Sequence, residues 1–455
     1  MGDNAAMRAL LPLLLATALQ AQSPFLVKPY LQLGDAPKPA PRERLDLMWQ
    51  TEDREGTWSV EIQGPQGWVA QPRPTFRRMA APPLPPHRIY RATLAGLAPG
   101  ARVPYRVKQG GTVVFEATAQ ARKPGAHRFL VTGDAAEGTP AQVAIAHAMA
   151  ARHPDFVFIA GDLVYPRGRV SDYRARFFPV YNAEDAPLLR QVPFLGVPGN
   201  HDVPWDLQRW PDALAYFAEW SLPLNGPALR PGDPGAAPAV ARLHDAVRTA
   251  AGSAFPRMAS YSFEYGGIHW TVLDSNPYVD WESPRLKAWL EADLKAAQSA
   301  TWRVVALHHP LFQTSRSHAE DQWMRPLSPI LERYGVDLVF AGHVHNYQRT
   351  APLRFVPTQV RRRGEPVDGH FEVDTAYDGQ RVTRAHGIIH LVTGAGGAHL
   401  YDRGQGADRA SWQPWTRAFV SDRNSFTEVD VDGRTLRLRQ LDAVGQPLDA
   451  ITLTK

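Results

Sequence analysis

The stretch FVFIAGDLVY, residues 156–165, shows the pattern from which the fold of this 455-residue chain can be predicted. Its five apolar residues predict a buried strand, and the Gly161-Asp162 pair after them predicts a turn at the strand's end. The same design, an apolar run followed by glycine or polar residues, recurs in FLVTGDA (129–135), FLGVPGNHD (194–202), VVALHHP (304–310) and LVFAGHVH (338–345). Residues 140–152, 171–181, 284–298 and 321–334 have helical spacing. The alternation predicts an α/β fold of sheet layers flanked by helices, with function at the carboxyl ends of the strands.

The residues at those five strand ends are metal ligands by type. Carboxylates can bridge two cations, imidazoles bind transition metals, and asparagine offers a neutral oxygen. In the GHVH motif, the i, i+2 spacing of His343 and His345 places both rings on one face if the segment is extended. A single Gly-Asp pair after a strand is usually only a turn. Five such endings in order favour a site for two adjacent metals.

The composition is that of a globular protein with a sizeable core. Hydrophobic residues make up 44% of the chain and charged residues 21%, with 50 Lys and Arg against 45 Asp and Glu. The basic residues are not clustered with exposed aromatic residues, so no nucleic-acid platform is expected. No stretch approaches the ~20 apolar residues of a transmembrane helix, so no membrane span is expected.

The first residues have the pattern of an export signal. Met7-Arg8 precedes an apolar run from Ala9 to Leu19, and small residues permit cleavage near Ala21. The sequence therefore predicts a signal peptide over residues 1–21 and an exported protein, periplasmic or extracellular. A frayed N-terminal helix is the alternative. Because the chain has no cysteine, any metal would be bound by His, carboxylate, amide or phenol groups.

The chain divides into an all-β part and an α/β part. Residues 25–122 show short alternating runs between turn residues, which predict a small antiparallel β-sandwich. Residues 126–350 carry the strand-end motifs, and residues 351–455 form the C-terminal part of the same domain. Two segments, an insert at about 223–256 and a polar, Arg-rich stretch at 354–384, are expected to be surface loops.

In chain order, the motifs GDA, GDLVY, GNHD, HHP and GHVH resemble those of the calcineurin-like metallophosphoesterases. Tyr165 in GDLVY makes the chain similar to the purple acid phosphatases in particular. The likeness covers nearly the whole chain, because larger members of that family also carry an N-terminal fibronectin type III-like domain, here residues 25–122. It implies a four-layer αββα sandwich preceded by that all-β domain.

The resemblance also implies roles for individual residues. Asp134, Tyr165 and His345 would hold one metal, Asn200, His308 and His343 would hold the other, and Asp162 would bridge them. The phenolate of Tyr165 implies Fe(III) in the first site, with a divalent Zn, Mn or Fe ion in the second. His201 and His318 resemble the outer-sphere histidines of the family, which contact the substrate phosphate or protonate the leaving group. A solvated loop histidine is the alternative for His318.

The implied substrate is a phosphate ester, and the implied reaction is hydrolysis of monoesters by attack of a metal-bound hydroxide. Two other functions stay open. The chain could be a phosphodiesterase or nucleotide-processing enzyme with a Mn or Zn pair, if Tyr165 only packs beside the site. It could also be a non-catalytic surface-binding module. The glycine-rich turn 394–397 is either a phosphate cradle or a tight turn, and His269 and His390 are expected in the core.

Overall fold

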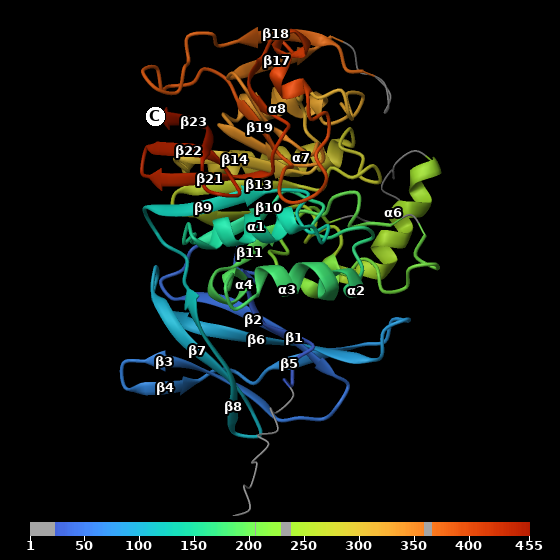
Figure 1. Cartoon of the computed structure of the whole chain (residues 1–455), viewed down its shortest axis with the longest axis vertical. Helices are drawn as coiled ribbons and strands as arrows, with labels where there is room; N and C mark the ends of the chain where they lie inside the picture. The colour runs from blue at the N-terminus through green and yellow to red at the C-terminus, as the bar shows by residue number, and fades with distance from the viewer. Residues whose placement is uncertain (1–22, 205, 229–237, 359–365) are drawn as a thin grey trace, which may run out of the picture.

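The computed structural model describes residues 23–204, 206–228, 238–358 and 366–455. Two large sheets face each other, helices lie on their outer faces, and a smaller all-β part lies at one end (Figure 1). The predicted signal peptide, residues 1–21, lies outside the described residues. Within them, no helix is long and apolar enough to cross a bilayer.

The first large sheet combines strands from the N-terminal and the C-terminal parts of the chain. It contains, in order, β23 (Pro447–Thr454), β22 (Thr435–Asp442), β21 (Ser425–Asp432), β9 (His127–Thr132), β10 (Phe156–Ile159), β11 (Phe194–Gly196), β1 (Val27–Gln32), β2 (Glu43–Glu52), β6 (His87–Leu97) and β5 (Thr75–Met79). Strands β9, β10 and β11 are parallel. Strand β11 also pairs with β1, where Phe194 lies opposite Gln32. The all-β part and the α/β part therefore share one continuous sheet.

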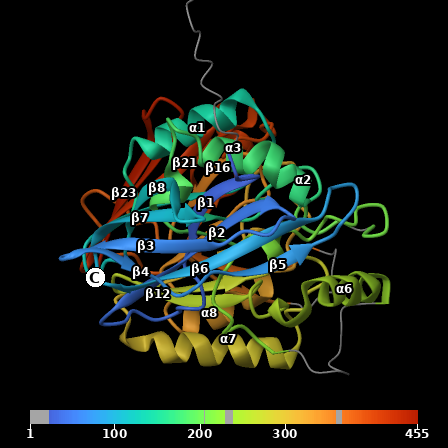
Figure 2. The same ribbon diagram turned by 90° about the horizontal axis from the view of Figure 1, so that it is seen from below.

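A second, four-stranded sheet completes the all-β part. Its order is β4 (Gly67–Ala70), β3 (Trp58–Gly64), β7 (Arg102–Gln109) and β8 (Thr112–Gln120). It packs on β1, β2 and β6 through a buried aromatic core, in which Trp49 stacks on Tyr90 at 5.2 Å and lies 5.7 Å from Trp58. Figure 2 shows these strands from below. The likeness of this part to a fibronectin type III domain stays a prediction.

The second large sheet belongs to the α/β part. Its order is β12 (Tyr261–Tyr265), β13 (Ile268–Leu273), β14 (Trp302–Leu307), β15 (Leu338–Ala341), β19 (Ile389–Thr393), β16 (Tyr347–Thr350) and β20 (Thr416–Val420). Large aromatic rings fill the space between the two large sheets. Trp270 of β13 stacks on Phe158 of β10 at 5.3 Å and on Phe340 of β15 at 5.9 Å. Burial of such rings is the main force that holds two sheets face to face.

Helices cover both outer faces of this pair of sheets. Beside the first sheet lie α1 (Pro140–Ala150), α2 (Val170–Asp172), the π-helical turn η1 (Tyr173–Phe177), α3 (Phe178–Tyr181) and α4 (Leu188–Gln191), as Figure 1 shows. On the second sheet lie α7 (Pro284–Ala296) and α8 (Ser328–Arg333). Helix α7 buries Leu286, Leu290 and Leu294, one face of the helix at i, i+4 spacing. The predicted helix–sheet–sheet–helix order is confirmed.

The two segments expected to be loops contain regular structure. The insert at 223–256 includes helix α6 (Pro238–Ala251) and the turn η2 (Gly252–Ala254). Five of the helix's residues are alanine, the strongest helix former. The stretch 354–384 includes the hairpin of β17 (Leu353–Pro357) and β18 (Gly369–Val373). Buried and exposed residues alternate along β17, so the Phe355 side chain is buried. Its ring centroid lies 4.6 Å from that of Phe371 and 5.4 Å from that of Phe312. The polar composition of the loop concealed this period-two pattern.

One predicted helix is shorter than expected. The segment 321–334 starts with turns and η4 (Arg325–Leu327), and helix α8 begins only at Ser328. Asp321 is turned toward two histidines instead of continuing a helix. The remaining short elements are α5 (Tyr216–Glu219), η3 (Ala297–Ser299), η5 (Gln405–Ala407) and η6 (Arg409–Ser411).

Candidate metal centre

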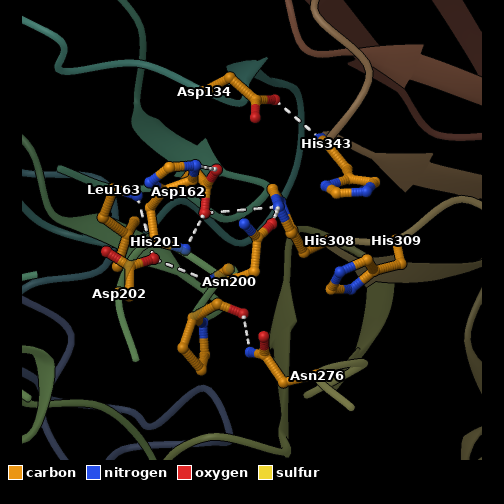
Figure 3. Close-up of polar contacts among 12 residues, drawn as sticks. Asp134, Asp162, Leu163, Asn200, His201, Asp202, Asn276, His308, His309 and His343 are labelled. Atoms are coloured by element: carbon orange, nitrogen blue, oxygen red, sulfur yellow. Dashed lines mark hydrogen bonds and ion pairs between the residues drawn. The ribbon is translucent and has the colours of Figure 1, made fainter. Parts of the chain in front are cut away.

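The polar residues after five strands meet where the two large sheets face each other (Figure 3). Parallel strands present their carboxyl ends at one edge, and this holds for β9, β10 and β11 in one sheet and for β14 and β15 in the other. Direct bonds join the two sheets there. The backbone N–H of His343 donates to Oδ2 of Asp134 at 2.8 Å, and His308 Nδ1 donates to the Ala160 carbonyl at 2.9 Å. The carboxyl ends of these strands therefore lie together, as the sequence predicted.

The backbone at this edge is strained. Asp134, Asp162 and His343 have φ values of 55°, 48° and 68°, in the left-handed region that costs a residue with a side chain about 1 kcal/mol or more. The chains also approach closely: a Cβ added to Gly161 would lie 2.2 Å from Nδ1 of His308. Such strain persists only where the surrounding structure holds it, and it is concentrated at functional sites.

One group of donors comes from Asp134, Asp162, Tyr165 and His345, all buried. The Tyr165 hydroxyl lies 3.1 Å from Asp134 Oδ1 and 2.9 Å from His345 Nε2. His345 donates its Nδ1 proton to the His399 carbonyl at 2.6 Å, so the lone pair of Nε2 points into the group. Ligand atoms of the two aspartates and His345 all lie within 4.8 Å of one another.

The second group comes from Asn200, His308 and His343, and Asp162 borders it as well. His308 Nε2 lies 3.0 Å from Asn200 Oδ1 and 3.4 Å from Asp162 Oδ1. The ring centroids of His308 and His343 are 5.0 Å apart. Because Nδ1 of His308 donates to a carbonyl, its Nε2 faces the asparagine oxygen lone pair to lone pair. Two acceptors held this close, with no proton between them, fit a cation.

Electrostatics at the centre follow from burial and from the neighbouring groups. Burial lowers the pKa of His343 to about 4, although the hydrogen bond that the ring donates to the Asp321 carboxylate raises it. A neutral imidazole is the form that binds a metal. Burial and the carboxylates of Asp134 and Asp162 raise the pKa of the Tyr165 phenol well above its ordinary value. A bound cation reverses the sign of such a field and favours the phenolate.

His201 and His318 lie at the mouth of the centre, outside both groups. The His201 ring packs on Tyr165 at 4.4 Å, donates from Nδ1 to the Pro166 carbonyl, and places Nε2 4.0 Å from Asp162 Oδ2. The His318 ring centroid lies 4.1 Å from that of His343. The structure therefore brings all nine predicted residues together, seven as possible ligands and two above them.

Four further residues shape the centre. The Asp321 carboxylate lies between His318 Nδ1 at 2.9 Å and His343 Nε2 at 3.0 Å; burial raises its pKa, but these two histidines lower it overall to well below its ordinary value. Tyr401 stacks on His345 at 4.0 Å, and His309 lies with His308 and His343 in another group of possible ligands. The carboxylate of Asp202 accepts the N–H groups of Leu163, Val164 and Gly199, and so holds two of the loops.

Sequence reasoning missed Asp321, Tyr401 and His309 as site residues. Asp321 carried a signal, since it follows His318 by three residues, the spacing of a local turn. His309 lay inside the HHP motif. Nothing in the local sequence marked Tyr401.

The glycine-rich turn after β19 is bonded to the residues that follow β9. The N–H of Gly396 donates to the Gly133 carbonyl, and the N–H of Ala398 donates to the Asp134 carbonyl. These amides therefore hold the turn against β9. His269 and His390 are buried in strands β13 and β19, as predicted.

Two facing sheets flanked by helices, with metal-ligand residues at their strand ends, define the metallophosphoesterase type of fold. Residues 127–347 match the family model described as calcineurin-like phosphoesterase. The chain thus contains a calcineurin-like metallophosphoesterase domain, and its relatives include purple acid phosphatases. It is 27% identical over 293 residues to purple acid phosphatase 23 of Arabidopsis thaliana, a match that covers 57% of each chain. The chain thus spans little more than half the length of this curated relative.

Solved structures show the same fold. Purple acid phosphatase PPD1 from yellow lupin (Lupinus luteus) seeds superposes with a TM-score of 0.68 at 17% identity, over 94% of this chain and 74% of that chain. The structure of PhoD superposes with a TM-score of 0.59 at 14% identity, over 95% of this chain and 94% of that chain. The predicted calcineurin-like metallophosphoesterase domain and the predicted fold are both confirmed.

Proposed function

We propose that the chain is an exported dinuclear-metal phosphoesterase that hydrolyses phosphate monoesters. The observation that carries the proposal is that two groups of metal-ligand atoms lie side by side and share Asp162. A structural metal site usually closes four ligands around one ion. Two adjacent open groups of oxygen and nitrogen donors suit a hydrolytic metal pair instead.

In this proposal, Asp134, Tyr165 and His345 would hold Fe(III), and Asn200, His308 and His343 would hold a divalent Zn, Mn or Fe ion. Asp162, which borders both groups, would supply a ligand to each ion. When bound, such a pair lowers the pKa of a water molecule and neutralises charge on the phosphoryl group. The phenol is the main reason to choose iron, because Tyr165 lies within hydrogen-bond distance of two other proposed ligands of that ion.

His201 and His318 act on the substrate in this proposal. Because His201 Nδ1 donates to the Pro166 carbonyl, its Nε2 is the nitrogen that can donate to a phosphoryl oxygen when the ring is protonated. His318 Nδ1 donates to the Asp321 carboxylate at 2.9 Å, so Nε2 is the nitrogen left to face the substrate. Its Nε2 then carries the proton for the oxygen of the leaving alcohol.

The test compares p-nitrophenyl phosphate with bis-p-nitrophenyl phosphate from pH 4 to 9, with Asp162→Ala as the control. Faster turnover of the monoester at acid pH supports the proposal. Preference for the diester favours the phosphodiesterase alternative with the same site. Absence of metal-dependent turnover of either compound overturns the enzyme proposal and favours a surface-binding module.

Export rests on the pattern of residues 1–21. The test is N-terminal sequencing of the protein recovered from the periplasm and from the medium. A mature chain that begins just after Ala21 supports export. A chain that keeps Met7 and Arg8 and stays in the cytoplasm overturns it.

A further inference from the structure

An exposed arginine lies beside His201 at the mouth of the metal centre. Arg167 follows Pro166, and its Nη1 donates to the Pro166 carbonyl at 3.1 Å. His201 Nδ1 lies 3.1 Å from the same carbonyl oxygen. The guanidinium and the imidazole are therefore neighbours, no farther apart than these two hydrogen bonds in succession allow.

The same contacts relate Arg167 to the metal centre. His201 Nε2 lies 4.0 Å from Asp162 Oδ2, and the His201 ring packs on Tyr165 at 4.4 Å (Figure 3 shows His201 and Asp162). The Pro166 carbonyl and the His201 ring lie between the guanidinium and the shared carboxylate. A phosphoryl group bound at the centre would leave its ester oxygen or its substituent within reach of Arg167.

Among the residues that the structure describes, no carboxylate forms an ion pair with Arg167. Arg169, two residues later, differs: Asp172 binds its guanidinium through both carboxylate oxygens, at 2.8 and 3.0 Å. A guanidinium without a carboxylate partner can bind an incoming anion without first breaking an ion pair.

A second arginine, Arg209, lies on a segment that is bonded to the loop of Arg167. The segment 206–215 is bonded to the loop of Arg167, since Ala215 N–H donates to the Gly168 carbonyl. The Trp210 ring of this segment packs against two guanidinium groups. Its centroid lies 4.8 Å from the guanidinium carbon of Arg169 and 5.1 Å from that of Arg209. The carboxylates here are engaged: Asp206 accepts the Arg209 N–H, and Asp212 accepts from Ser171. Arg167 is the arginine of this region that shares a carbonyl partner with His201.

We propose that Arg167 binds a second phosphate group of the substrate. The preferred substrates are then esters that carry one phosphate for hydrolysis at the metal centre and another for the arginine fork. A guanidinium matches phosphate geometry with two parallel hydrogen bonds, and a substrate with a single phosphate leaves this fork to water. This inference rests on the proposed phosphoesterase function and adds a substrate class to it.

The test uses the metal-loaded full chain and two matched substrates, propyl phosphate and propane-1,3-diol bisphosphate. We expect kcat/KM to favour the bisphosphate, and Arg167→Ala to reduce this preference about tenfold, the usual effect of one lost charge-assisted bond. Arg167→Lys keeps the charge but loses the fork, so it retains part of the preference. Arg417→Ala is the control, because Arg417 is also exposed and donates to the carbonyl of its preceding residue.

Two results overturn the inference: equal kcat/KM for both substrates in the unaltered chain, or an equal fall for both in Arg167→Ala. If neither substrate is hydrolysed, the proposed function fails. Calorimetric binding of the two compounds to the metal-loaded chain then decides the role of Arg167 separately. A lower affinity of Arg167→Ala for the bisphosphate alone still supports it, and equal affinities for both compounds overturn it.

Discussion

A buried glutamate where the all-β part meets the α/β part makes stability depend on pH. Glu219, in α5, is 1% exposed. Its Oε2 accepts hydrogen bonds from Gln50 Nε2 and from the Tyr30 hydroxyl, and both donors belong to the N-terminal strands. Its Oε1 has no hydrogen-bond partner among the described residues. Burial raises the pKa of Glu219 from 4.5 to about 7, although Arg174 lowers it.

The size of the effect follows from this pKa. The folded chain holds the Glu219 proton more tightly than the unfolded chain does. The stability that this group contributes is therefore complete below pH 4.5 and is lost as the pH rises through 7. One pKa unit is worth about 1.4 kcal/mol, so the loss is about 3 kcal/mol of unfolding free energy.

Glu219→Gln stays neutral at every pH, so it should remove this loss. We expect the variant to be more stable than the unaltered chain by up to about 3 kcal/mol at pH 8 and equally stable at pH 4.5. Urea unfolding at the two pH values measures this difference. Glu55→Gln, at an exposed position of the all-β part, is the control. If Glu219→Gln changes stability by the same amount at both pH values, the reasoning is refuted.

Three other predictions concern the metal centre. Gly161→Ala should lower the unfolding free energy by about 3 kcal/mol, because the new Cβ would meet His308 and the φ of residue 161 is +84°. Gly404→Ala is the control in the same urea experiment and should have little effect, because a Cβ at residue 404 would face open space. Tyr165→Phe should remove the visible absorption of the iron-loaded protein while its circular dichroism is kept, and persistence of the band would show that the phenol does not bind iron. Removal of metal with dipicolinate should lower the unfolding free energy of the loaded protein by about 3 kcal/mol or more, and Asp162→Ala should abolish this response; an equal response in the variant would place the metal elsewhere.

Much of the metal centre could be predicted from sequence because its ligands are local features of strand ends. Gly161 and Asp162 directly follow an apolar run, and the direction of a parallel strand determines at which edge its last residue lies. The spacing of His343 and His345 is equally local. The alternation of apolar runs and helical segments predicted sheet layers flanked by helices, and the family resemblance implied their helix–sheet–sheet–helix order.

Other features could not be predicted, because they depend on contacts between distant parts of the chain. Tyr401 stacks on His345 only after the loop beyond β19 folds against β9. The nitrogen that His308 offers to a metal is set by the Ala160 carbonyl, 148 residues away in sequence. The hairpin at residues 353–373 was mistaken for a loop, since its polar composition concealed the pattern that buries Phe355.

The type of fold, the order of the strands that end in possible ligands, and the chemical kind of each such residue can be predicted from the sequence. Those properties depend on runs of fewer than about ten residues, in which apolar periodicity and turn residues act locally. Only the folded chain shows that Asp162 borders both groups of donors, that Asp321 lies between two histidines, and that Arg167 shares a carbonyl partner with His201. It alone could decide them, because the packing of two sheets, and not local spacing, sets the distances between side chains from different strands.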